Sequence, residues 1–99
     1  MAPKISIDRQ KIEAFCLKHH ISRLALFGSV IREDFRPDSD VDVLVEFQKG
    51  YVPGFAFFSL QSELSEILGR KADLHTPRFL SRYFRDQVLA DSQVQYAAA

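Results

Sequence analysis

The sequence has one cysteine, no tryptophan and only four glycines and four prolines among its 99 residues. A single cysteine excludes an intramolecular disulfide and any zinc site built from several cysteines. Cys16 lies in an apolar-periodic stretch, so we expect it to act as a small buried hydrophobe. The chain shows no internal repeat, low-complexity tract or linker rich in proline and serine, which predicts a single domain over residues 1–99.

Long apolar runs are also absent. The longest contain four or five residues, whereas a helix that crosses a bilayer needs about 20. Charged residues, among them Lys4, Asp8 and Lys11, interrupt the N-terminal stretch where a signal peptide would need an apolar segment. We therefore expect a soluble, cytoplasmic protein with no membrane partner.

An excess of charge of either sign is missing as well. Thirteen Lys and Arg balance thirteen Asp and Glu, so the chain lacks the net basic character that gripping a nucleic-acid backbone requires. Nucleic acid is therefore not an expected partner. In contrast, hydrophobic residues make up 46% of the chain and nine are phenylalanines, which is ample material for a core.

Hydrophobic periodicity and turn residues predict an α/β (α+β) fold around a small sheet. Asp8 is the expected N-cap of the first helix, and Gly69 is expected to end the second. A short helical turn is expected at 30–35, and the C-terminal QYAAA is expected to be frayed or an addition from expression. The predicted helices cover 8–20, 57–68 and 77–90, and the predicted strands cover 21–27, 40–47 and 71–76.

Asp40 and Asp42 start the clearest strand, DVDVLVEF. Residues i and i+2 of a strand point to the same face, so these carboxylates repel each other unless a proton, hydrogen bonds or a cation compensates. Ligands that are all oxygen favour Mg²⁺ or Mn²⁺. Taken alone, the pair is slightly more typical of a turn cap or a solvated edge, since such short patterns recur by chance.

Two further features strengthen the metal interpretation. Gly28 and Ser29 follow a buried strand and open a short helical stretch, an arrangement that suits a phosphate because glycine permits close approach and helix N-termini attract anions. Asp73 lies in the later strand KADLHT and could project beside the pair. Three carboxylates on one face are what a two-metal site needs.

The run GSVIREDFRPDSDVDVLVEF, together with the downstream strand aspartate, resembles the signature of the nucleotidyltransferase superfamily that includes DNA polymerase β. A length near 100 residues makes the chain similar to its minimal nucleotidyltransferase (MNT) members. The resemblance implies a small mixed β-sheet flanked by helices, with a nucleotidyltransferase-like core. The motif departs from many larger relatives at Glu33-Asp34, where they carry Arg-Gly-Glu, and no carboxylate ligand is lost by this.

The resemblance also implies roles for the motif residues. Gly28 and Ser29 would hold the phosphates of ATP, with Arg32 and Ser39 also in the nucleotide site. Asp40, Asp42 and Asp73 would be the catalytic carboxylates and would hold two Mg²⁺ ions, or Mn²⁺. Small proteins of this kind resemble the antitoxin of HEPN–MNT pairs, which transfers AMP to a tyrosine of a HEPN ribonuclease toxin. A HEPN-type toxin is thus the implied partner, in a homo-oligomer or hetero-oligomer.

Other interpretations stay open at this point. The chain could be a binding-only antitoxin or regulatory subunit, or could modify a small molecule, although it has no extra domain to bind one. His75 alternates with Asp73, yet a satisfied or solvent-facing histidine is favoured over a metal ligand. The stripe Arg78, Arg82 and Arg85 is typical of a solvated helix face. The cluster at 55–58 is expected in the core, or at a protein-binding patch if exposed.

Overall fold

The computed structural model describes residues 7–28, 40–51, 54–77 and 82–98. The turn expected at 30–35 and residues 78–81 of the expected last helix lie outside these ranges. No helix within these ranges is long and apolar enough to cross a membrane. In chain order the elements are α1 (Arg9–Lys18), β1 (Ile21–Phe27), β2 (Val41–Phe47), α2 (Ala56–Leu68), β3 (Ala72–His75), α3 (Arg82–Asp91) and β4 (Gln93–Ala97).

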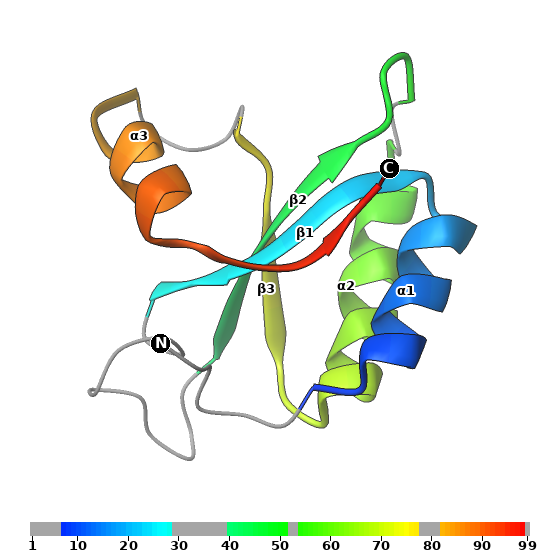
Figure 1. Ribbon diagram of the computed structural model, residues 1–99. Coiled ribbons are helices and arrows are strands. Elements are labelled where there is room, and N and C mark those ends of the chain that lie inside the picture. The colour runs from blue at the N-terminus through cyan, green and yellow to red at the C-terminus, as the bar shows by residue number, and fades with distance from the viewer. Residues whose placement is uncertain (1–6, 29–39, 52–53, 78–81, 99) are drawn as a thin grey trace.

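The four strands form one mixed sheet in the order β3-β2-β1-β4. Strand β1 is antiparallel to both of its neighbours, whereas β2 and β3 are parallel. Helices α1 and α2 lie side by side on one face of the sheet, and α3 lies on the opposite side (Figure 1). The expected α/β fold, a small mixed sheet flanked by helices, is therefore confirmed.

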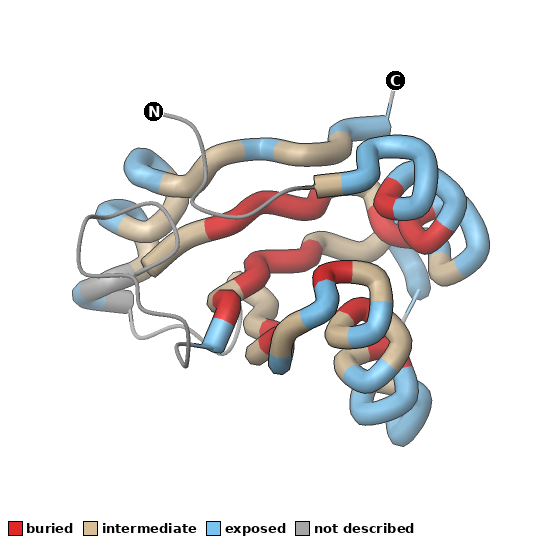
Figure 2. The backbone as a smooth tube through the Cα atoms, turned by 90° about the horizontal axis from the view of Figure 1, so that it is seen from below, coloured by how far each residue is buried: buried red, intermediate tan, exposed pale blue. Residues whose placement is uncertain are grey.

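The core fills the space between the sheet and the two helices α1 and α2 (Figure 2). Val41, Val43 and Val45 alternate along β2, and each is fully shielded from solvent, because every second side chain of a strand points to the same face. Cys16 is buried among these apolar groups, and burial raises the pKa of its thiol to about 12. It is the structural cysteine that the sequence predicts.

Local capping signals in the sequence are confirmed at both helices. The Asp8 carboxylate accepts hydrogen bonds from the backbone N–H groups of Gln10 and Lys11, at 3.1 and 3.2 Å. Gly69 ends α2 in the left-handed region with a φ of 68°, which glycine adopts without the steric cost of a Cβ.

Polar side chains of α2 hold the outer edge of β3. Ser65 Oγ accepts a hydrogen bond from the backbone N–H of Ala72 at 2.9 Å, and Gln61 Oε1 accepts one from Leu74 at 3.1 Å. An edge strand otherwise exposes such donors, so these bonds fix β3 against the helix. Since β3 carries Asp73 and His75, its position decides where those side chains lie.

The end of α1 is tied to α2 through one carboxylate. Lys18 Nζ and His19 Nε2 each lie 3.2 Å from Glu63 Oε1. Burial by itself would raise the pKa of Glu63, but the contacts with His19 and Lys18 outweigh it and lower that pKa. Because Glu63 lies 45 and 44 residues from Lys18 and His19 along the chain, no local pattern predicts this contact.

The expectation of a frayed C-terminal tail is wrong for the described residues. Gln93–Ala97 forms β4, which pairs antiparallel with β1. The Ala98 backbone N–H also donates to the Ser22 carbonyl at 2.8 Å. The reason is tertiary: β2 covers only one edge of β1, and the free edge provides hydrogen-bonding partners that the tail's own composition does not reveal.

The expectation that the cluster at 55–58 lies in the core is also wrong for two of its members. Phe55 is 94% exposed and Phe58 is 72% exposed, whereas Phe57 packs against the core. Because neighbouring residues in a helix point about 100° apart, only one of two adjacent phenylalanines can share the inward face with Leu60 and Leu64. Tyr83 of α3 is likewise exposed.

Substitutions on the inward and outward faces of α2 should differ in their effect on stability. Leu64→Ala removes a side chain that is fully buried and should lower the free energy of unfolding by about 2–5 kcal/mol. Phe58→Ala, on the outward side of the same helix, should change it by no more than about 0.5 kcal/mol. Urea unfolding of both variants measures the difference. An equal loss in the free energy of unfolding would contradict the placement of Leu64 in the core and Phe58 outside it.

Candidate functional site

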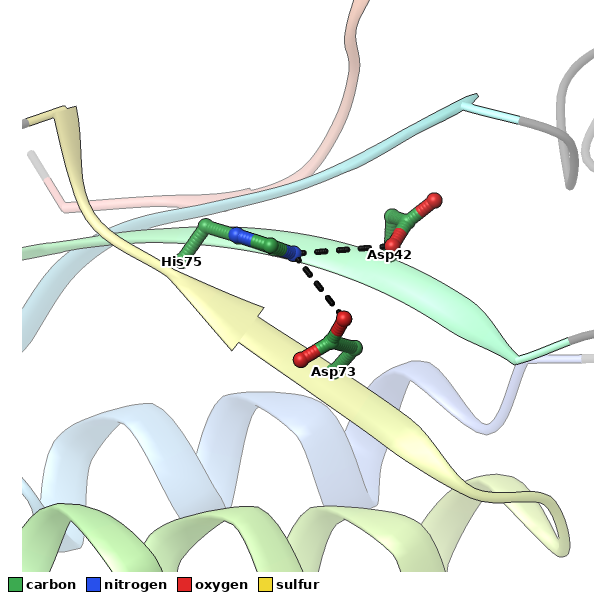
Figure 3. A group of neighbouring side chains, drawn as sticks. All are labelled: Asp42, Asp73 and His75. Carbon is green, nitrogen blue, oxygen red and sulfur yellow. Dashed lines mark ion pairs between the residues drawn. The ribbon is translucent and has the colours of Figure 1, made fainter. Parts of the chain in front are cut away.

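The parallel pairing of β2 and β3 places two carboxylates opposite each other. Asp42 is the register partner of Asp73, one step after the pair Val41 and Ala72. Alternation sends Val41 and Ala72 into the core, so Asp42 and Asp73 point to the other face of the sheet (Figure 3). Both stay partly accessible, with 31% and 50% of their side-chain surface exposed.

His75 joins the two carboxylates. It follows Asp73 by two residues on β3, and its Nε2 lies 3.5 Å from Asp42 Oδ1 and 3.4 Å from Asp73 Oδ2. One ligand atom from each of the three residues lies within 4.8 Å of the others. The Phe27 ring and the imidazole pack edge to face, with ring centroids 5.2 Å apart. The site is therefore a cluster of two oxygen ligands and one nitrogen ligand.

Gly28 directly follows β1 and lies beside Asp42. Its φ is +72°, and a Cβ at this position would collide with Asp42 Oδ2 and crowd Cγ at 3.2 Å. Both the positive φ and the close approach require glycine. The fold therefore places the backbone of Gly28 against the Asp42 side chain, and the phosphate-binding role expected of Gly28 remains a prediction.

Asp40 is placed differently from Asp42. The strand ladder begins at Val41, whose N–H donates to the Lys71 carbonyl at 2.9 Å, so Asp40 precedes the paired residues. Its carboxylate is 46% exposed and lies 3.8 Å from Lys71 Nζ. The structure therefore brings Asp42 and Asp73 together and leaves Asp40 beside Lys71, outside the group of three ligand atoms.

Several other candidates from the sequence lie outside the described part of the chain. These are Ser29, Arg32 and Ser39 of the motif, and Arg78 of the basic stripe. Their roles remain predictions.

The electrostatics of the cluster favour a positive charge between the carboxylates. The polar contact with Asp42 raises the pKa of His75 above its usual value, and the negative charge of Asp73 adds to this, while burial opposes both. The same two carboxylates would favour a divalent cation for the same reason. Carboxylate oxygens suit Mg²⁺ or Mn²⁺, and such ions also bind phosphate oxygens.

His75 is the member of the cluster that sequence reasoning gave a satisfied or solvent-facing role. Its alternation with Asp73 was the available signal, because i and i+2 on a strand share a face. What the sequence could not show was that β3 pairs with β2 in a register that turns this face toward Asp42.

Comparisons with known proteins agree with the geometry. The family described as polymerase beta, nucleotidyltransferase matches residues 10–98. A protein of Methanocaldococcus jannaschii assigned as a protein adenylyltransferase is 33% identical over 84 residues, which are 85% of this chain and 89% of that protein. The protein adenylyltransferase MntA of Thermococcus cleftensis is 36% identical over 55 residues, about half the length of each chain.

Solved structures have the same fold. One assigned as a minimal nucleotidyltransferase is 34% identical, with a TM-score of 0.71 over 85% of both chains. A chain of a toxin–antitoxin complex with AMP-PNP is 21% identical, with a TM-score of 0.74 over 93% of this chain and 75% of that one. A chain from a complex of tri-AMPylated Shewanella oneidensis HEPN toxin with MNT antitoxin has a TM-score of 0.65 at 21% identity, over 91% and 70%.

Gly28→Ala tests the close approach to Asp42. The added Cβ must displace the Asp42 carboxylate and must also occupy a positive φ. Gly50→Ala is the matched control, because Gly50 has a φ of +86° but no atom within 4 Å of the added Cβ. We expect Gly28→Ala to lower the free energy of unfolding by at least about 1 kcal/mol more than Gly50→Ala in urea titrations. Equal losses would mean that strain alone requires glycine at 28.

The pKa of His75 in the metal-free protein provides a second test. Asp42→Asn should lower this pKa, since contact with Asp42 is the main cause of its rise. A raised folded-state pKa stabilises the protein below the ordinary value of about 6.5, and this contribution is lost as pH rises through the folded-state pKa. NMR titration of the imidazole protons measures the shift. Glu63→Gln, beside His19, is the control, and an unchanged His75 titration in Asp42→Asn would refute the assignment.

Proposed function

This chain belongs to the polymerase beta-type nucleotidyltransferase family, and we propose that it transfers AMP from ATP to a hydroxyl group of a partner protein. The family predicted from the sequence motif is therefore confirmed. The protein acceptor is supported by the Methanocaldococcus jannaschii relative, which covers most of the chain and is assigned as a protein adenylyltransferase.

The observation that carries this proposal is the juxtaposition of Asp42 and Asp73 with the backbone of Gly28. The donor set fits a divalent ion: two facing carboxylates are partly exposed on the open face of the sheet and repel each other without a cation. Asp42 and Asp73 would hold Mg²⁺. When bound, such an ion neutralises phosphate charge and lowers the pKa of an attacking hydroxyl.

Asp40 would complete a second metal position. Its carboxylate lies 3.8 Å from Lys71 Nζ, and both side chains are exposed to solvent. Exposed ion pairs of this kind contribute about 0–1 kcal/mol to the free energy of unfolding. If Asp40 bound a metal ion in place of Lys71, the protein would therefore lose little stability. This supports the expectation that Asp40, Asp42 and Asp73 act as one set of catalytic carboxylates.

The reaction forms a bond between the acceptor oxygen and the α-phosphorus of ATP. The bond from that phosphorus to the oxygen bridging to the β-phosphorus breaks, and pyrophosphate leaves. Asp73 would act as a ligand or would accept the hydroxyl proton. Gly28 would let the triphosphate approach the backbone, and Ser29, Arg32 and Ser39 would contact the phosphates and the loop around them.

The partner we propose is a HEPN-type ribonuclease toxin in the cytoplasm, with a tyrosine as acceptor, so that this chain acts as its antitoxin. Support comes from the fold shared with an MNT antitoxin that was solved with a tri-AMPylated HEPN toxin. A domain of this size forms only one wall of an acceptor site, and the toxin would supply the rest.

Intact-mass measurement tests the proposal. The chain is expressed with the HEPN toxin of its own host and incubated with Mg²⁺ and ATP. We expect AMP-sized increments on the toxin, and Asp42→Asn should slow their appearance at least about 100-fold, as loss of a group that stabilises transition-state charge does. Glu46→Gln is the matched control, because Glu46 lies on the same strand but pairs with Arg23 at 3.6 Å.

The alternatives give different results. A stable complex whose mass does not change would indicate a binding-only antitoxin. Undiminished transfer by Asp42→Asn would disprove the assigned carboxylate site, while transfer lost equally in Glu46→Gln would show only a general effect on the fold.

A further inference from the structure

The imidazole of His75 points its Nε2 between two carboxylates without a well-formed hydrogen bond to either (Figure 3). This nitrogen is shielded from solvent and has no hydrogen-bond partner within the described part of the chain. Its distances to Asp42 Oδ1 and Asp73 Oδ2 are 3.5 and 3.4 Å, longer than the 2.7–3.2 Å of N–H···O bonds, which cluster at about 2.9 Å.

Those distances do match the spacing of ligands around one small ion. Metal–ligand bonds of about 2.1 Å place neighbouring ligands about 3.0 Å apart in an octahedron and about 3.4 Å apart in a tetrahedron. The nitrogen is nearly equidistant from one oxygen of each carboxylate. The three ligand atoms all lie within 4.8 Å of one another, so one small ion can contact all three after slight adjustment of the side chains.

Neighbouring residues hold this arrangement, while the two carboxylates stay partly accessible. Phe27 of β1 packs against the imidazole in an edge-to-face arrangement, and Gln61 of α2 holds the β3 backbone beside it through the Leu74 N–H. At the same time 31% of the Asp42 side chain and 50% of that of Asp73 remain exposed. Water or phosphate oxygens can therefore complete the coordination shell.

We propose that His75 is a direct metal ligand through Nε2, and that its nitrogen makes the site prefer a first-row transition-metal dication to Mg²⁺. The inference rests on the proposed function and deepens it by assigning metal selectivity. Mg²⁺ strongly prefers oxygen ligands, whereas imidazole binds transition-metal dications well. Mn²⁺ accepts both donor types in octahedral geometry, which makes it the natural probe.

The test measures Mn²⁺ and Mg²⁺ binding to the purified chain by titration calorimetry, without ATP or partner. His75→Val should weaken Mn²⁺ binding by at least about tenfold, the lower end of what loss of even a supporting contact costs, and should change Mg²⁺ binding much less. His20→Asn is the matched control, since it removes a histidine at the far end of β1 whose φ of 58° asparagine tolerates. His75→Gln serves as a second variant if valine impairs folding.

Electron spin-echo spectroscopy of bound Mn²⁺ gives a direct readout. The wild-type chain and His20→Asn should show coupling to an imidazole nitrogen, and both His75 variants should lack it. Absence of this coupling in the wild type, or equal losses of Mn²⁺ and Mg²⁺ affinity in His75→Val, would overturn the inference. Because no AMP transfer is measured, a chain that binds Mn²⁺ through His75 but modifies no toxin would contradict the proposed function and leave this inference standing.

Discussion

Asp42 and Asp73 face each other because β2 and β3 are parallel and paired in one register, and the other features of the site depend on that register. A shift by one residue would turn Asp73 and His75 into the core and bring Ala72 and Leu74 to the open face. Two interactions oppose such a shift. The apolar residues of β3 are buried against α2, and α2 also accepts hydrogen bonds from the outer edge of β3 through Ser65 and Gln61.

Bringing these carboxylates together costs free energy that the fold must offset. Two carboxylates on directly paired strand residues repel each other. The metal-free chain reduces this repulsion by directing the His75 imidazole at both. The same arrangement prepares the site for a cation, because the negative charges and the nitrogen already converge. Gly28 adds the backbone approach that any larger residue would block. The fold thus offsets the repulsion between these side chains, and the same side chains are placed to bind a metal.

Sequence reasoning anticipated much of the fold because its signals are local. The Asp8 cap, the Gly69 terminus and the alternating valines of β2 each reflect interactions between residues a few positions apart, and the structure contains all of them. The family, too, was predictable, since the motif that carries it lies within one continuous stretch of chain. By contrast, exposure of Phe55 and Phe58 depended on which helix face meets the sheet, and β4 depended on the free edge of β1.

Some features of the candidate site were likewise predictable from local sequence, and others depend on strand pairing. The sequence by itself determined that Gly28, Asp42 and Asp73 are present with strand and turn conformations around them, because backbone preference and side-chain period act within a few residues. Only the tertiary structure decided that Asp42 meets Asp73 and His75, and that Asp40 lies beside Lys71 instead. Strand partners come from distant parts of the chain, and their register is selected by the burial of one entire face, a quantity that no local pattern contains.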